Sequence, residues 1–135
     1  MKKNPRFQLV RTGTDTVRWR LLGGNNVSLG SGACEYARTE DCLAAIDWVG
    51  HHHTELTGEF SHSSGGRWRW RLRSDTELIA VASHAYGRRI EAQRSLERFH
   101  AGVAEAISGQ EIDTIADWRT KYARHSQDNS EYGSD

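Results

Sequence analysis

Residues 67–73 read RWRWRLR and carry the clearest chemical signal in the chain. If this stretch forms a β-strand, its side chains alternate between the two faces, so the arginines line one face and the tryptophans the other. Arginines on one face would repeat at about 6.6–7 Å, close to the phosphate repeat of an extended nucleic-acid strand. Such a row could bind nucleic acid or another polyanion. The candidate residues, including two from the related stretch 18–21, are Arg18, Arg20, Arg67, Arg69, Arg71 and Arg73.

A structural interpretation of the same arginines is also open. In it the tryptophans fill a core, and the arginines on the other face are solvated or paired with carboxylates. Residues 105–135 contain seven acidic and three basic residues, so this segment could cover the arginines within the same chain. The sequence favours this interpretation, because the aromatic rings that would stack on bases are needed for the core.

The three histidines at 51–53, with His62 nearby, suggest a metal site. Adjacent histidines in a linker seldom converge on one ion, and no HExxH spacing accompanies them. We therefore expect no biological metal site and no cofactor, although the run could bind nickel or zinc in vitro. The same histidines could titrate near their ordinary pKa of about 6.5 and so weaken a packed linker in mild acid.

Tyr36 and Tyr86 are each followed two positions later by an arginine. A Tyr-x-Arg pair beside a helix N-terminus could hold a small anion. In a structural role, the tyrosine would pack under the helix and its hydroxyl would tie down the loop. The structural role is favoured, because the feature occurs twice and no further residue distinguishes either occurrence.

The sequence lacks a catalytic motif. Cys34 has no visible His and carboxylate partners, and Cys42 falls on the apolar face of a predicted helix, where a thiol is normally inert. The motifs GxGxxG, GxxxxGK[ST], GxSxG and CxxC are all absent. We therefore expect a protein that is not an enzyme and has no catalytic residue.

Composition excludes several classes of protein. The 135 residues include 18 Lys and Arg and 18 Asp and Glu, so the formal net charge is zero and a uniformly basic nucleic-acid coat is excluded. No run of 18 apolar residues is present, which predicts no membrane contact. The N-terminus lacks the apolar region of a secretory signal, and two cysteines support no disulfide scaffold. The expected location is the cytoplasm.

An internal repeat organises the elements that must position these residues. The sequence RWRL at 18–21 recurs at 69–72, 51 residues later, and Tyr36 matches Tyr86 at a spacing of 50. Apolar and charged positions of the two copies also agree beyond these matches, from Leu9 and Phe60 to Val49 and Phe99.

Each copy is predicted to contain three strands and a helix. The strands are expected at 7–12, 17–21 and 27–29 in the first copy and at 58–62, 67–73 and 77–82 in the second. The first helix is expected to begin after Thr39 as its N-cap and to end at Gly50, and the second to span 89–107. A third helix is expected at 110–124, followed by a mobile tail at 125–135.

The predicted fold is α+β, with two pseudo-symmetric β-β-β-α repeats sharing one core and an antiparallel sheet packed with helices. Its single domain would consist of repeat one at 7–50, a linker at 51–56, repeat two at 57–107 and the extra helix. The expected core residues of the repeats are Trp19, Leu21, Tyr36, Trp68, Trp70, Leu72 and Tyr86.

These residues resemble the repeat unit of the small YegP-like proteins, a family of unknown function often found as tandem repeats in bacteria and archaea. The resemblance covers about residues 7–49 and 57–103. It departs from the family pattern at Gly58, where a leading Phe is expected, and at Glu35 and Ala85, where a Gly usually precedes the Tyr. The matching residues are Phe7, Leu9, Gly13, Val17, Arg18, Trp19, Arg20, Leu21, Tyr36 and Arg38, then Phe60, Trp68, Arg69, Trp70, Arg71, Leu72, Tyr86 and Arg88.

The resemblance implies a fold and assigns no activity, so three function classes stay open. The leading one is a non-catalytic interaction or scaffold module that pairs with itself as a homodimer or docks another protein. The alternative is binding of nucleic acid or another polyanion through the arginine-lined strand face. The third is an enzyme with an unrecognised site between the repeats.

Overall fold

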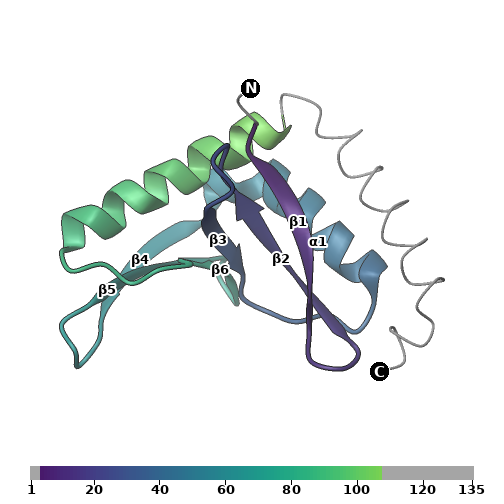
Figure 1. Cartoon of the computed structure of the whole chain (residues 1–135), viewed down its shortest axis with the longest axis horizontal. Helices are drawn as coiled ribbons and strands as arrows, with labels where there is room; N and C mark the ends of the chain where they lie inside the picture. The colour runs from purple at the N-terminus through teal and green to yellow at the C-terminus, as the bar shows by residue number, and fades with distance from the viewer. Residues whose placement is uncertain (1–3, 108–135) are drawn as a thin grey trace.

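The computed structural model describes residues 4–107, which form an α+β fold. Two helices pack on the same side of a six-stranded antiparallel sheet (Figure 1). The third helix expected at 110–124 and the tail expected at 125–135 lie outside the described residues.

The sheet has the strand order β1-β2-β3-β6-β5-β4, so β3 and β6 form its centre and β1 and β4 its edges. The 14-residue helix α1 (Thr39–His52) and the short 3-10 helix η1 (His53–Glu55) connect β3 to β4. Residues 89–107 form the other helix, which follows β6. The strands are β1 (Arg6–Thr12), β2 (Thr16–Leu22), β3 (Ser28–Gly32), β4 (Thr57–His62), β5 (Trp68–Arg73) and β6 (Leu78–Val81).

Alternation of apolar and polar residues explains how the sheet presents two different faces. In β2, Val17, Trp19 and Leu21 are buried under the helices, while the arginines between them lie on the opposite face. Trp70 and Leu72 of β5 are buried in the same way. The predicted alternation of both strands is therefore confirmed.

Phe99, on the 89–107 helix, joins the two halves of the core. Its ring centroid lies 6.3 Å from that of Trp19 and 4.9 Å from that of Trp70. All three side chains are fully buried. One aromatic cluster therefore links β2, β5 and this helix.

The predicted third strand was too short. We expected 27–29, whereas β3 runs over Ser28–Gly32 and includes a Gly-Ser-Gly sequence with low β-propensity. A Cβ at Gly30 would lie 2.7 Å from atoms of Phe99 and Trp70, and one at Gly32 would overlap the Trp19 ring. Glycines occupy this strand because the core rings pass directly against its backbone.

Both predicted ends of the first helix were wrong. Thr39 is the first helical residue rather than the N-cap, which is Arg38 and makes no side-chain capping bond. The helix also continues past Gly50 to His52, so most of the expected linker at 51–56 is helical. A Cβ at Gly50 would overlap the side chain of Ile107. Gly50 therefore permits close packing of the two helices and does not end α1.

Candidate anion-binding face

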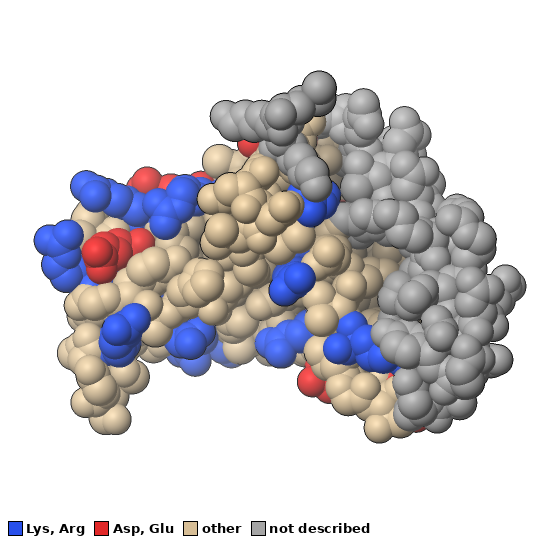
Figure 2. All heavy atoms as spheres, viewed as in Figure 1, with Lys and Arg blue, Asp and Glu red and all other residues tan. Residues whose placement is uncertain are grey.

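The sheet face that points away from the helices carries five of the candidate arginines, and we call it the arginine face. Residues paired across neighbouring strands share a face, and one such row crosses all six strands. It consists of Gln8, Arg20, Ser31, Val81, Arg71 and Glu59. Arg18, Arg69 and Arg73 lie on the same face by alternation. Figure 2 shows Lys and Arg atoms spaced along the lower margin of the molecule, beneath the sheet.

The arginines nearest the sheet centre are held by uncharged groups. Arg18 Nε donates a hydrogen bond of 2.6 Å to the Gly32 carbonyl, and Arg69 Nη1 donates one of 3.2 Å to the Ala82 carbonyl. Arg20 Nε donates one of 2.7 Å to Gln8 Oε1. A guanidinium has five N–H donors. These bonds therefore orient each group and leave other donors for a ligand.

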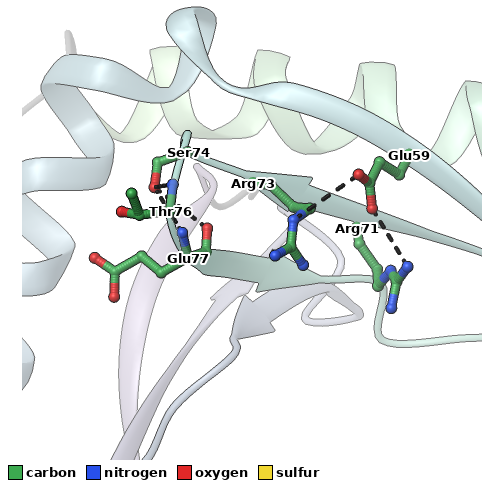
Figure 3. A network of polar contacts seen from close by, with 6 residues as sticks. All are labelled: Glu59, Arg71, Arg73, Ser74, Thr76 and Glu77. Atoms are coloured by element: carbon green, nitrogen blue, oxygen red, sulfur yellow. Dashed lines mark hydrogen bonds and ion pairs between the residues drawn. The ribbon is translucent and has the colours of Figure 1, made fainter.

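The outer arginines are partly neutralised. Glu59 lies between Arg71 and Arg73, with its oxygens 3.3 Å from Arg71 Nη2 and 3.8 Å from Arg73 Nε (Figure 3). All three side chains are partly exposed, so each ion pair contributes about 1 kcal/mol or less to stability. Glu59 lowers the positive potential at this edge of the sheet, and it makes Arg71 and Arg73 weaker candidates for binding an anion.

Arg67 was expected within a strand, but β5 begins at Trp68 and Arg67 is exposed just before it. Its Nη2 donates a hydrogen bond of 2.7 Å to the Ala85 carbonyl. A small hollow of about 100 Å³ contacts both Arg67 and Arg69 and is otherwise lined by Ser61, His62, Ser63 and Ala85. Arg67 therefore extends the basic surface beyond the end of the strand.

A larger hollow of about 480 Å³ lies over the sheet centre, and we call it the arginine groove. Arg18, Arg20 and Arg69 line it, and no Asp or Glu among the described residues does. Three serines and His84 add polar groups, and two of the hydroxyls, Ser28 and Ser83, lie 2.5 Å apart. Guanidinium groups and hydroxyls are strong hydrogen-bond donors to phosphate and carboxylate oxygens. This groove is therefore suited to an anion.

Trp68 does not join the buried core as we expected. Its ring stacks on the ring of His62, with the two centroids 4.4 Å apart. The Cζ atom of Arg89 lies 5.6 Å from the centroid of the Trp68 ring and 5.1 Å from that of the Phe60 ring. Trp68 alternates with Trp70, so it lies on the helix side of the sheet, near the start of the 89–107 helix. The helix leaves this end of β5 partly uncovered, and an arginine stacks there instead of an apolar side chain.

Tyr36 and Tyr86 each attach the loop in which they lie to a neighbouring strand, Tyr36 to β2 and Tyr86 to β5. The backbone of Tyr36 pairs with Val17, and that of Tyr86 pairs with Trp68. The Tyr86 hydroxyl also donates a hydrogen bond of 3.0 Å to Ser95 Oγ. Burial raises the pKa of the Tyr36 hydroxyl, and the nearby Cys34 thiol raises it further. These contacts support a structural role for both residues.

The three adjacent histidines separate in the fold. His51 and His52 contact backbone carbonyls of their own helix, whereas His53 is buried and its Nδ1 lies 2.7 Å from Nδ1 of His100. Within residues 4–107 no group of three or more His, Cys, Asp or Glu side chains is placed to hold a metal ion. The histidine pair instead joins η1 to the 89–107 helix.

This pair predicts a loss of stability in mild acid. Burial lowers the pKa of both His53 and His100, and His100 lowers that of His53 further. Below the unfolded pKa of about 6.5, the unfolded chain binds protons that the folded chain does not. We expect the melting temperature to fall between about pH 7.5 and pH 5.5. The variant His100→Gln should reduce this fall, and the exposed control His51→Ala should not; a melting temperature independent of pH would contradict the prediction.

Burial makes the Cys42 thiol unavailable as a nucleophile. Cys42 is fully buried, and burial raises the pKa of its thiol to about 12. Cys34 is exposed, and both thiols are free. A protonated, buried thiol is unreactive.

No family model and no curated protein matches the sequence. The fold, however, is shared with solved structures. A UPF0339 protein from Shewanella oneidensis superposes with a TM-score of 0.64 at 12% identity, over 74% of this chain and 85% of that one. The protein yegP from E. coli, described as of unknown function, gives a TM-score of 0.59 at 16% identity, over 77% and 90%. The chain has a YegP-like fold. At these identities the likeness is one of fold, as the sequence resemblance implied.

The YegP-like fold brings to the groove residues that sequence patterns did not single out. Ser28, Ser31 and Ser83 come from β3 and from the segment after β6, which the order of strands places together. Their sequence carries no motif. Pairing of β2 with β3 and of β5 with β6 places them near the arginines, and pairing of β3 with β6 joins the two sets in one groove.

No helix within residues 4–107 is long and apolar enough to span a membrane.

Proposed function

We propose that this chain is a non-catalytic binding module built from two repeats related by pseudo-twofold symmetry about the β3–β6 pair. Several contacts recur at the repeat spacing and support this. The bridge between Val17 and Tyr36 corresponds to that between Trp68 and Tyr86. The bond from Arg18 to the Gly32 carbonyl likewise corresponds to that from Arg69 to the Ala82 carbonyl.

The module's ligand, in this proposal, is a single-stranded nucleic acid bound along the arginine groove. The observation that carries it is that Arg18, Arg20 and Arg69 line one groove that no Asp or Glu of residues 4–107 lines. Each of the three is positioned by an uncharged partner, and no carboxylate within the described part of the chain forms an ion pair with it. Phosphate contacts of this kind supply most of the affinity of sequence-independent binding.

The dimensions of the groove favour an elongated ligand. Arg18 and Arg69 lie on strands that are three steps apart in the sheet, which corresponds to about 14 Å. Both side chains extend inward, Arg18 to the Gly32 carbonyl of β3 and Arg69 to the Ala82 carbonyl after β6. A chain of phosphates laid across β3 and β6 would contact both arginines, and the serine hydroxyls between them offer further donors.

Fluorescence polarisation of labelled single-stranded DNA, single-stranded RNA and duplex DNA tests the proposal. With three phosphate contacts, a fourfold rise in salt should weaken binding of a single strand about 20-fold. We expect measurable binding at about 50 mM salt that follows this dependence. Absence of binding at that salt concentration, or binding insensitive to salt, would overturn the proposal and leave a protein partner as the ligand to seek.

A further inference from the structure

A second, larger cavity of about 640 Å³ lies beside the 89–107 helix, and we call it the helix-side cavity. The 89–107 helix forms one wall and the turn between β2 and β3 another; the two lie against each other in Figure 1. Its apolar lining comes from Pro5, Val27, Leu29, Ala101 and Gly102. Ser28 and His84 line both this cavity and the arginine groove, so the two hollows adjoin there, whereas the residues of the 89–107 helix line this cavity alone.

Two hydroxyls, those of the buried Ser95 and the half-buried Tyr86, line one part of the helix-side cavity. Ser95 is 3% exposed, and its Oγ accepts hydrogen bonds from Trp70 Nε1 at 2.8 Å and from the Tyr86 hydroxyl at 3.0 Å. A hydroxyl has one hydrogen to donate. Within residues 4–107 no acceptor receives the hydrogen of Ser95, which lines the cavity together with Tyr86. This wall can therefore donate a hydrogen bond to a ligand oxygen.

Arg98 supplies a positive charge next to these hydroxyls. It follows Ser95 by three residues, which places both side chains on one side of the helix. Arg98 forms no ion pair or hydrogen bond with any described residue. Glu105 also lines the cavity, seven residues further along and thus about 10 Å away along the helix axis. A ligand with one anionic group at Arg98 fits, whereas a second anionic group near Glu105 would be repelled.

The equivalent hollow in the first half lacks these polar groups. It is smaller, about 200 Å³, and is lined by Tyr36, Ala45 and Trp48 among others. Ala45 and Trp48 stand 50 positions before Ser95 and Arg98. The hydroxyl and the cation are therefore specific to the second half, while the tyrosine is present in both.

We propose that the helix-side cavity binds a small organic monocarboxylate with an aromatic or branched aliphatic body. The carboxylate would pair with Arg98 and accept a hydrogen bond from Ser95, and the apolar body would lie against Leu29, Val27 and Ala101. A charge-assisted pair between guanidinium and carboxylate would fix the orientation. Burial of the apolar body would supply affinity. This proposal does not depend on nucleic-acid binding at the arginine face.

Titration followed by amide chemical shifts tests it, with phenylacetate, indoleacetate and isovalerate as probes and phenylacetamide as the uncharged control. We expect at least one carboxylate to bind with a millimolar or lower Kd, and phenylacetate to bind at least tenfold more tightly than phenylacetamide. Shifts should centre on residues 95–102 and on the β2–β3 turn. Equal binding of phenylacetate and phenylacetamide, or no binding of any of the three carboxylates, would overturn the proposal.

Two variants and a matched control localise the site. Arg98→Gln should weaken carboxylate binding at least tenfold, whereas Arg94→Gln, which changes an exposed arginine of the same helix outside the cavity, should not. Ala101→Trp should block the cavity; its side chain is exposed, so the fold should tolerate it. Carboxylate binding that survives either Arg98→Gln or Ala101→Trp in a folded variant would overturn the assignment.

Discussion

The double variant Arg20→Glu/Arg69→Glu is expected to lose single-stranded nucleic-acid binding while keeping its fold. Both side chains line the arginine groove and neither is fully buried, so the substitutions create no core cavity. Each lost hydrogen bond to a charged phosphate costs about 1.5–3 kcal/mol. Loss of two such bonds therefore weakens binding at least about 100-fold, and repulsion between the new glutamates and the phosphates weakens it further. Fluorescence polarisation at low salt measures the loss, and a circular dichroism melt checks the fold.

A matched variant separates the groove from net charge. Arg38→Glu/Arg94→Glu changes the net charge equally, and both of these arginines are exposed, one preceding α1 and the other on the 89–107 helix. We expect this control to retain most of the binding at moderate salt. If both double variants lose affinity equally, binding follows overall charge and the groove has no special role.

Phe99→Ala is expected to be the most damaging single core substitution. The ring is fully buried and contacts Trp19 and Trp70, so its removal leaves a cavity where the two halves of the core meet. Replacing a buried Phe by Ala costs about 3–5 kcal/mol, a large share of the roughly 5–15 kcal/mol by which such domains are stable. Chemical denaturation followed by tryptophan fluorescence measures the free energy of unfolding.

The control for this core prediction is Ile90→Ala, on the same helix. Ile90 is 41% exposed, so its truncation should change stability by about 0.5 kcal/mol or less. If the free energy of unfolding of Phe99→Ala falls by less than about 1 kcal/mol, the packing of the two tryptophans does not depend on this ring.

Local patterns sufficed to predict most of the fold. Alternation placed Trp19 and Trp70 in the core, and the spacing of apolar residues predicted the 89–107 helix. Predictions failed where tertiary packing overrides local preference. Gly30 belongs to a strand because Phe99 and Trp70 pass against it, and Gly50 lies within α1 because Ile107 packs there.

The candidate site could be predicted only in part. The arginines of β2 and β5 follow from alternation, but their partners do not. Pairing of β3 with β6 brings Arg18 and Arg69, which are 51 positions apart, to one groove. Pairing of β4 with β5 brings Glu59 to Arg71, and thereby divides the row into neutralised and available arginines. The pattern of residues within one β-strand does not indicate which other strand will pair with it.

Mapping the binding surface tests the central claim most directly. Amide and arginine Nε chemical shifts of the full chain would be recorded while an unlabelled single-stranded oligonucleotide is added at low salt. We predict that the largest changes fall on Arg18, Arg20 and Arg69 and on Ser31 and Val81 between them, and that they are reversed by added salt. Changes confined to the helices, or no changes at low salt, would contradict the claim that the open sheet face is the binding surface.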